Sequence, residues 1–454
     1  MRRVSLALGA LFLPGTAAAQ DAPERPAVKF NRWQEDWRPL ADPARRTRPL
    51  DGVKYLPLGG DSYLSLGGGA RLRYEHQEQG FGISAAPDEY LIARIEAHAD
   101  LRLGQHVQAF VQLLDAEAPG KRQIQGPDAN RLDLEQGFVA LVLPLGRDTI
   151  KARAGRQQFA FDLQRFVSAR DGPNVRQSFD ALWADYETPR WRFIGYLTQP
   201  VVNRDARPFD DGSSRAQTFS GLRVEYKLAG RHELSFYWSR YTQDGARFVD
   251  ARGDETRDVF DLRFAGQAGR WDWDLEAMAQ RGRVGAASVE AWALGLLGGY
   301  ALALPAAPRI GLQIDVASGD RRAGDGRVET FNPLFPNGYY FTIAGFTGDA
   351  NLIHVKPSLT LRPVKPLKLL LAGAAQWRLT SADAVYRQPN VAIPGTAGRP
   401  GRYTGAYAQL RADWTIAPGL SAALEGVYFA IGRVLRDAGG SDGRYLGIEL
   451  KYGF

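Results

Sequence analysis

The sequence predicts an all-β protein: a closed transmembrane antiparallel β-barrel of about 18 strands, with short periplasmic turns and long extracellular loops. Two observations lead to this fold class. Apolar side chains occupy every second position in a series of short segments between residues 63 and 454, and successive strand side chains point to opposite faces. The connections between these segments are alternately short turns and mostly long loops, which is the asymmetry of outer-membrane barrels.

The last segment, 445–454, shows the alternation most simply. Its even positions are all apolar, whereas its odd positions include Glu449 and Lys451. A strand with one apolar face fits a soluble sandwich, where that face meets a second sheet, as well as a barrel in lipid. The sorting of long and short connections favours the barrel, because a sandwich has no reason to place its long loops at one end.

The chain begins with a predicted secretory signal peptide, residues 1–19. Arg2 and Arg3 precede an apolar run that ends at Leu13, and three alanines precede Gln20, an order typical of a cleaved signal. The run is shorter than the roughly 20 residues that a spanning helix needs. Residues 20–62 lack strand periodicity and are predicted to be a periplasmic lead-in that packs into or under the barrel, which occupies 63–454.

Eighteen strands are predicted, and an even number returns both ends of the barrel to the periplasm. Two positions deviate from the alternation. Glu290 shares the parity of apolar Trp292, which indicates either a position at the membrane rim or a bulge, and Leu370 falls on the inward face. The predicted ranges are 63–75, 90–102, 105–114, 133–143, 149–158, 178–187, 191–198, 216–226, 233–241, 257–266, 271–281, 288–301, 307–317, 350–362, 367–378, 404–414, 419–430 and 443–454.

Composition excludes several classes of site. The chain has no cysteine, which excludes disulfides, a thiolate zinc site and a cysteine nucleophile. Its five histidines lack metal-ligand spacing, and the acidic loop 320–325 lacks the spacing of a calcium loop. The net charge of +7 is small beside 57 basic and 50 acidic residues, so it does not indicate nucleic acid. We expect no metal, no cofactor and no enzymatic activity.

Strand parity turns many charged side chains toward the lumen. An Arg or Lys on the lipid face near the midplane would cost about 2 to 4 kcal/mol. Two interpretations remain open: the charges brace the wall as pairs, or the arginines form a selectivity zone for anions. The basic candidates from parity are Arg71, Arg73, Arg94, Arg153, Arg263, Arg309 and Lys356, and an acidic wall of Asp272, Asp274 and Glu276 lies about half a barrel away.

Short motifs in a characteristic order give the chain a family resemblance. They include residues 32–37 (RWQEDW), 54–58 (KYLPL), 67–75 (GGGARLRYE), 155–157 (GRQ), 174–180 (NVRQSFD), 317–320 (ASGD) and 331–336 (FNPLFP). In these the chain resembles the alginate export family of outer-membrane porins. The resemblance implies an eighteen-stranded barrel narrowed by inward loops, with a basic selectivity zone for a uronate polymer. The matching positions are Lys54, Arg71, Arg73, Arg94 and Arg156, although strand parity by itself turns Arg156 outward.

These observations predict a channel in the outer membrane of a Gram-negative bacterium that exports an anionic, alginate-like polysaccharide through an Arg-lined constriction. Two alternatives remain: a porin for uptake of small organic or sugar acids, and a structural or adhesive barrel without conductance. The expected partners are anionic polysaccharide or acidic saccharide, outer-membrane lipid and periplasmic secretion components, and nucleic acid is not among them.

Overall fold

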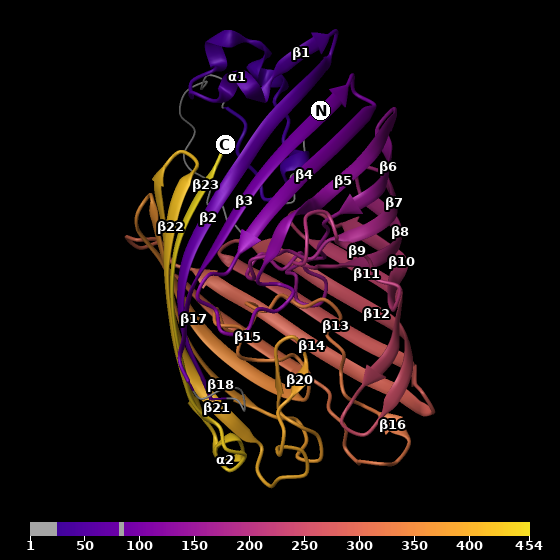
Figure 1. The fold of residues 1–454 in the computed structure, drawn as a ribbon, viewed down its shortest axis with the longest axis vertical. Helices are drawn as coiled ribbons and strands as arrows, with labels where there is room; N and C mark the ends of the chain where they lie inside the picture. Colours follow the sequence, from indigo (N-terminus) through magenta and orange to yellow (C-terminus); the bar gives the residue numbers. More distant parts are fainter. Residues whose placement is uncertain (1–24, 81–85) are drawn as a thin grey trace.

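The computed structural model describes residues 25–80 and 86–454, and the predicted signal peptide, residues 1–19, lies outside them. Among the described residues, eighteen long strands form one closed antiparallel barrel (Figure 1). The barrel closes directly, because its first strand pairs with its last: Arg71 opposes Lys451, and Arg73 opposes Glu449. The predicted fold class and strand number are confirmed.

Each predicted segment coincides with one barrel strand, and the ends differ by a few residues. Several strands extend further toward the long loops than the alternation indicated. The barrel strands are β2 (Ser62–Gly80), β3 (Asp88–Leu103), β4 (Val107–Glu117), β5 (Asn130–Leu145), β6 (Asp148–Gln157), β7 (Phe179–Glu187), β8 (Trp191–Val202), β10 (Gln217–Lys227), β11 (Glu233–Arg247), β12 (Arg252–Ala268), β13 (Trp271–Val284), β14 (Ala287–Ala301), β15 (Arg309–Ala317), β17 (Leu352–Val364), β18 (Leu367–Trp377), β21 (Tyr403–Ala417), β22 (Leu420–Ile431) and β23 (Ser441–Gly453).

The remaining elements are short. Five of them lie before the barrel, at the end where the short turns and the C-terminus are found (Figure 1). No helix in the described ranges has the length and apolar character to cross a bilayer. The short elements are η1 (Arg32–Gln34), η2 (Arg38–Ala41), η3 (Pro43–Arg45), α1 (Asp51–Lys54), β1 (Leu56–Gly59), β9 (Gly212–Ser213), β16 (Arg327–Val328), β19 (Tyr386–Arg387), β20 (Val391–Ala392) and α2 (Arg433–Arg436).

The outer face carries the apolar side chains that the alternation predicts. Leu222 in β10, Leu262 in β12 and Leu294 in β14 are each at least 50% exposed, whereas Arg223 and Asp261, beside the first two in sequence, are buried. Because successive side chains alternate between faces, an exposed apolar belt on every strand is the surface that a barrel presents to lipid.

The two positions that deviate from the alternation are explained by their pairing. Glu290 lies on the outer face close to the β13–β14 turn, 3.9 Å from Arg281, and the register of β13 with β14 has no irregularity. The rim interpretation is therefore right and the bulge is wrong. Leu370 opposes Arg411 in the sheet, so it faces inward as predicted.

A charge on the lipid face should cost far more than the same charge on a turn. We expect Leu222→Arg, in the middle of β10, to lower the free energy of unfolding by about 2 to 4 kcal/mol. Leu304→Arg is the matched control, since Leu304 is as exposed as Leu222 but lies in the turn between β14 and β15. Denaturant titration of the barrel in lipid vesicles measures both. Equal losses for the two variants would contradict a lipid belt at Leu222.

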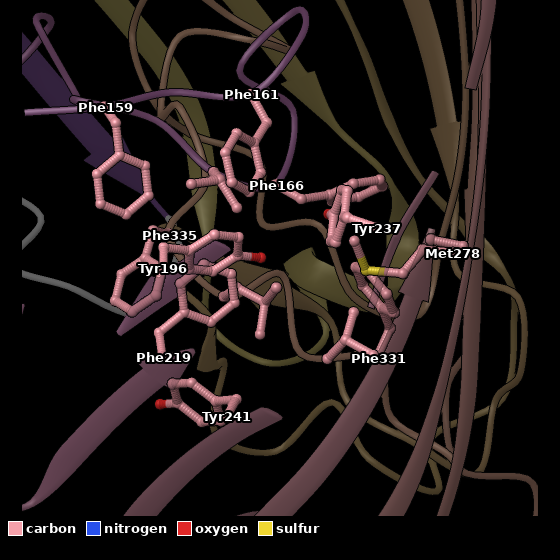
Figure 2. Close-up of a cluster of buried hydrophobic side chains, with 14 of the residues drawn as sticks. Phe159, Phe161, Phe166, Tyr196, Phe219, Tyr237, Tyr241, Met278, Phe331 and Phe335 are labelled. Carbon is pink, nitrogen blue, oxygen red and sulfur yellow. The ribbon is translucent and has the colours of Figure 1, made fainter. Parts of the chain in front are cut away.

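Two long loops fold into the lumen instead of staying outside it. Residues 158–178 and 318–351 contribute Phe161, Phe166, Phe331 and Phe335 to a buried aromatic cluster with side chains of β7 to β14 (Figure 2). Backbone bonds join the loops to each other, since the amide of Ser168 donates to the carbonyl of Phe335 at 2.9 Å. The lumen is therefore partly filled by two loops that are bonded to each other.

Candidate functional site: a basic vestibule and its constriction

A cavity of about 520 Å³ lies between the lead-in and the inner wall of the barrel. The lead-in, β2, β3, β23 and the loop 158–178 all contribute to it. We call it the basic vestibule, because eight of its lining side chains are cationic and one is acidic. The cationic residues are Arg25, Lys29, Arg32, Arg48, Arg71, Arg94, Arg176 and Lys451, and the acidic one is Glu96.

The lead-in is fastened to the seam where the barrel closes. Arg32 donates to the carbonyl of Gly68 in β2 at 3.0 Å and to that of the C-terminal Phe454 at 3.5 Å. The amide of Phe454 in turn donates to Gly68 at 3.1 Å. These bonds hold the first described segment of the chain, the first barrel strand and the last residue together at the mouth of the vestibule.

The loop 158–178 is bonded to the basic wall of the vestibule at Asp171, and we call this contact between loop and wall the constriction. The Asp171 carboxylate lies 2.8 Å from Arg94, 2.7 Å from Arg176 and 3.3 Å from Lys451, and Arg71 donates to its backbone carbonyl at 2.7 Å. Burial alone would raise the pKa of Asp171, but the positive charges of Arg176, Lys451 and Arg94 hold it well below its usual value. The Asp171 carboxylate therefore helps to tether the loop to the basic wall, together with the bonds from Arg71 to the loop backbone.

Arginines in this arrangement can bind a carboxylate that enters from the vestibule. Guanidinium groups present paired donors that match a carboxylate, and such charge-assisted bonds are stronger than neutral ones. Both guanidinium groups already pair with wall carboxylates, since Arg71 is 3.3 Å from Glu449 and Arg176 is 2.7 Å from Glu96. An anion that entered from the vestibule would compete with these carboxylates.

Arg73, although adjacent in β2 to the constriction, belongs to a separate network in the wall. It lies 2.9 Å from Glu75 and 2.7 Å from Glu425, donates to the hydroxyl of Tyr445 and stacks over the ring of Tyr339 at 5.3 Å. With its charge balanced on two sides, Arg73 braces the wall.

Each carboxylate of the predicted acidic wall pairs with an arginine. Asp272 pairs with Arg309, and Glu276 pairs with Arg165 from the loop 158–178. Asp274 lies 2.6 Å from Arg263. The bracing interpretation therefore describes this side of the lumen, and Arg263 and Arg309 do not stand free in it.

The other four predicted cations lie in different surroundings. Lys356 donates to the carbonyls of Tyr340 and Phe341, at 3.1 and 2.8 Å, and so anchors the loop 318–351. Arg153 has no carboxylate at ion-pair distance in the described chain and stacks on the rings of Trp33 and Trp183, at 4.3 and 5.2 Å. It fastens the lead-in to the wall.

Arg156 lies away from the constriction. Its guanidinium donates to Asp180 at 2.9 Å and to the carbonyl of Leu134 at 3.0 Å, and it lies 3.8 Å from Asp133. Strand parity had turned this side chain outward, whereas the motif match placed it in the selectivity zone. Arg156 is buried and pairs with carboxylates of the wall, so it does not join the other predicted cations at the vestibule.

Lys54, the last predicted cation, is wholly buried at the end of α1. Its ammonium group lies over the rings of Trp37 and Phe454, 5.1 Å from each centroid, and has no hydrogen-bond partner within the described ranges. Burial lowers the pKa of Lys54 to about 8. Docking of the lead-in therefore moves the charged ammonium group of Lys54 out of water, where it is more stable, into a buried position.

The Lys54 pKa sets a testable pH dependence. Between pH 8 and 10.5, a solvated Lys54 binds more protons than the docked one, so docking of the lead-in should become more favourable as pH rises through this window. The shift corresponds to roughly 3 kcal/mol at about 1.4 kcal/mol per pKa unit. We expect Lys54→Met to remove this dependence and to strengthen docking at neutral pH. Trypsin cleavage of the lead-in, followed against pH, measures it, with Lys227→Met in the wall as control; an unchanged profile in Lys54→Met would contradict the assignment.

Several residues of the vestibule, the constriction and the inward loops were not predicted from the sequence. Arg165, Asp171 and Arg176 lie in an inward loop, and Arg25 and Arg32 lie in the lead-in, where no strand periodicity assigns a face. The motif at 174–180, which includes Arg176, was a signal that this loop matters. Lys451 could have been found by extending the parity of the last strand into the candidate set.

Comparison with known proteins decides the family. The family model described as alginate export matches residues 62–449. The chain belongs to the alginate export family. The match spans all eighteen barrel strands apart from the last residues of β23, and the resemblance seen in the motifs is confirmed. No curated protein matches the chain.

Solved porin structures share the fold of this alginate export family member at low sequence identity. OccK2 of Pseudomonas aeruginosa, in complex with glucuronate, has a TM-score of 0.59 at 13% identity and covers 88% of this chain and 99% of its own. OccD3 of the same species has a TM-score of 0.60 at 12% identity, over 88% and 92%. A BenF-like porin of Pseudomonas fluorescens Pf-5 has 0.59 at 12% identity, over 86% and 99%. The protein is an outer-membrane β-barrel channel, and this architecture indicates a channel rather than an enzyme.

Proposed function

We propose that the channel conducts acidic saccharides of the uronate class, with an alginate-like polymer leaving the cell as its primary cargo. The observation that carries the proposal is the basic vestibule, where eight cations face the single carboxylate of Glu96. A focused positive potential raises the local concentration of anions and speeds their entry. The vestibule lies at the end of the barrel that holds the short turns and both described termini (Figure 1), which is the periplasmic end expected of such barrels.

The vestibule supports a polymeric cargo in a second way. Arg25, Arg32 and Arg48 of the lead-in and Arg71 and Arg94 of the wall form a continuous lining, so consecutive uronate carboxylates can move from one guanidinium to the next. Conduction needs binding that is favourable enough for entry and spread over enough sites for exit. The partners in this proposal are the acidic polysaccharide, outer-membrane lipid and periplasmic secretion components that deliver the chain.

Single-channel recording in a planar bilayer tests the proposal. Oligouronate added on the vestibule side should block the current in discrete events, and a neutral oligosaccharide of equal length should not. The block should weaken as salt rises, since the Debye length falls from about 10 Å at 0.1 M to about 3 Å at 1 M. Equal block by charged and neutral sugars would refute the role of the vestibule.

A second candidate function is uptake of small organic or sugar acids. It is favoured by the two loops that fill part of the lumen, because a narrowed path suits a monomer. One structural neighbour was solved with glucuronate and another, OpdK, with vanillate. Current block by monomeric glucuronate but not by oligouronate would favour this function. A bilayer that shows no conductance at all would overturn both candidates and favour a structural barrel.

A further inference from the structure

A buried carboxylate in the lumen wall lacks any partner. Asp261, in β12, is 1% exposed, and neither of its carboxylate oxygens accepts a hydrogen bond from the described residues. No Lys or Arg in the described ranges lies within ion-pair distance of it. A buried ionised carboxylate without a partner is strongly unfavourable, so the position calls for a ligand.

Two further carboxylates point to the same spot from different elements. One oxygen each of Asp162 in the loop 158–178, Asp261 in β12 and Glu276 in β13 lie within 4.8 Å of one another. Asp162 is also held by Arg223, at 2.6 and 2.8 Å, and Glu276 by Arg165. Each oxygen retains acceptor capacity beyond these bonds, because an ionised carboxylate offers about four lone-pair sites.

A neighbouring hydroxyl is an independent sign of a missing ligand. Tyr237 in β11 opposes Asp261 in the sheet, is completely buried and has no hydrogen-bond partner for its hydroxyl among the described residues. Because directly opposed residues of paired strands lie on the same face of the sheet, the side chains of Tyr237 and Asp261 are neighbours on the inner face. Tyr237 is part of the aromatic cluster (Figure 2), and its hydroxyl can serve as an oxygen ligand beside Asp261.

Negative charge exceeds positive charge in this part of the lumen. The guanidinium groups of Arg165, Arg223 and Arg263 lie close to six carboxylates. Asp261, which none of them contacts, is the seventh carboxylate of the region. Arg192 beside Glu225 and Lys356 near Asp315 reduce the excess without removing it. The carboxylates are Asp162, Glu225, Glu233, Asp261, Asp274, Glu276 and Asp315.

We propose that Asp162, Asp261 and Glu276, with the hydroxyl of Tyr237 nearby, bind a divalent cation of the calcium class. Ca²⁺ prefers oxygen ligands at about 2.3–2.6 Å, so two of its ligands can lie as far as roughly 4.6–5.2 Å apart, and three oxygens within 4.8 Å of one another satisfy this limit. Mg²⁺ requires a near-ideal octahedron and keeps several waters, which suits three buried carboxylates less well. The cation joins the loop 158–178 to β12 and β13 and so helps to fix the position of the constriction.

The test uses the full barrel in detergent, in a background that removes a second acidic group. Asp133, Asp210 and Asp211 also lie within 4.8 Å of one another, so Asp210→Asn with Asp211→Asn forms the parent. After EDTA and dialysis, titration with CaCl₂ should show one site, and Tb³⁺ should give luminescence excited through tyrosine. Asp261→Asn should weaken Ca²⁺ binding at least tenfold and abolish the Ca²⁺-dependent rise of the melting temperature. Asp258→Asn, on the outer face of the same strand, should leave both unchanged.

Two outcomes overturn the proposal. Absence of Ca²⁺ binding in the parent refutes the site directly and does not depend on any variant folding. Parent-like affinity in Asp261→Asn and in Glu276→Gln also refutes it. If the parent ignores Ca²⁺ and Asp261→Asn melts at a higher temperature than the parent, Asp261 carries a proton instead of contacting a cation.

Discussion

Replacing Arg71 and Arg94 together by glutamate is expected to reverse the anion preference that we propose for the channel, so that the variant prefers cations. Both side chains line the vestibule, and both hold the loop 158–178 at Asp171. The exchange shifts the local charge by four units and places two new carboxylates beside Asp171. An ion pair at about 4 Å near a protein surface is worth about 4 kcal/mol, and like charges repel by a similar amount, so the field at the constriction changes sign.

The reversal potential under a KCl gradient measures this effect. We expect the potential to change sign in the double variant and to move toward zero in each single one. Arg433→Glu is the control, because Arg433 is 93% exposed in α2, at the opposite end of the barrel from the vestibule (Figure 1), and it should leave the potential unchanged. A double variant that keeps the parent's anion preference would remove Arg71 and Arg94 from the selectivity determinants.

Arg165→Ala should be the most destabilising single substitution in the inward loops. Arg165 is 1% exposed, pairs with Glu276, lies 3.6 Å from Asp315 and donates to the hydroxyl of Tyr340 at 2.6 Å. Removing one partner of a buried ion pair costs about 3 to 5 kcal/mol, because the remaining charges are left uncompensated. Since Arg165 connects the loop 158–178 to β13, β15 and the loop 318–351, its loss should release both loops.

Two measurements follow the release of the loops. Limited proteolysis should cut the loops 158–178 and 318–351 faster in Arg165→Ala, and single-channel conductance should rise and become noisier. The matched control is Arg281→Ala: Arg281 is an exposed arginine at the barrel rim whose contact with Glu290 spans 3.9 Å, and such surface pairs contribute about 0 to 1 kcal/mol. Parent-like proteolysis and conductance in Arg165→Ala would show that the aromatic cluster alone holds the loops.

The barrel itself could be predicted from the sequence because its determinants are local. Whether Leu222 meets lipid and Arg223 meets the lumen follows from alternation along one strand, and the same argument placed Leu370 inward correctly. The confirmed fold therefore needed no knowledge of neighbouring strands. For Glu290, the sequence left two interpretations open, a position at the membrane rim or a bulge. Only the register of β14 with β13 distinguishes them.

The site was predicted only in part, because its chemistry depends on contacts between distant segments. Parity placed Arg71 and Asp272 on the inner face, yet it could not show that Arg309 neutralises Asp272 while Arg71 contacts a loop a hundred residues away. Arg176 and Arg32 lie in segments without strand periodicity, so the sequence does not assign their side chains to a face. The Asp162, Asp261 and Glu276 group escaped notice for the same reason, since its members come from three elements.

The bonds of Arg32 to Gly68 and to Phe454 have a consequence for biogenesis. The Gly68 acceptor belongs to β2, whereas the Phe454 acceptor is in place only once β23 has paired with β2, so the full set of bonds to Arg32 forms only when the barrel closes. Protection of the lead-in from protease should therefore report when a newly made channel has closed its barrel.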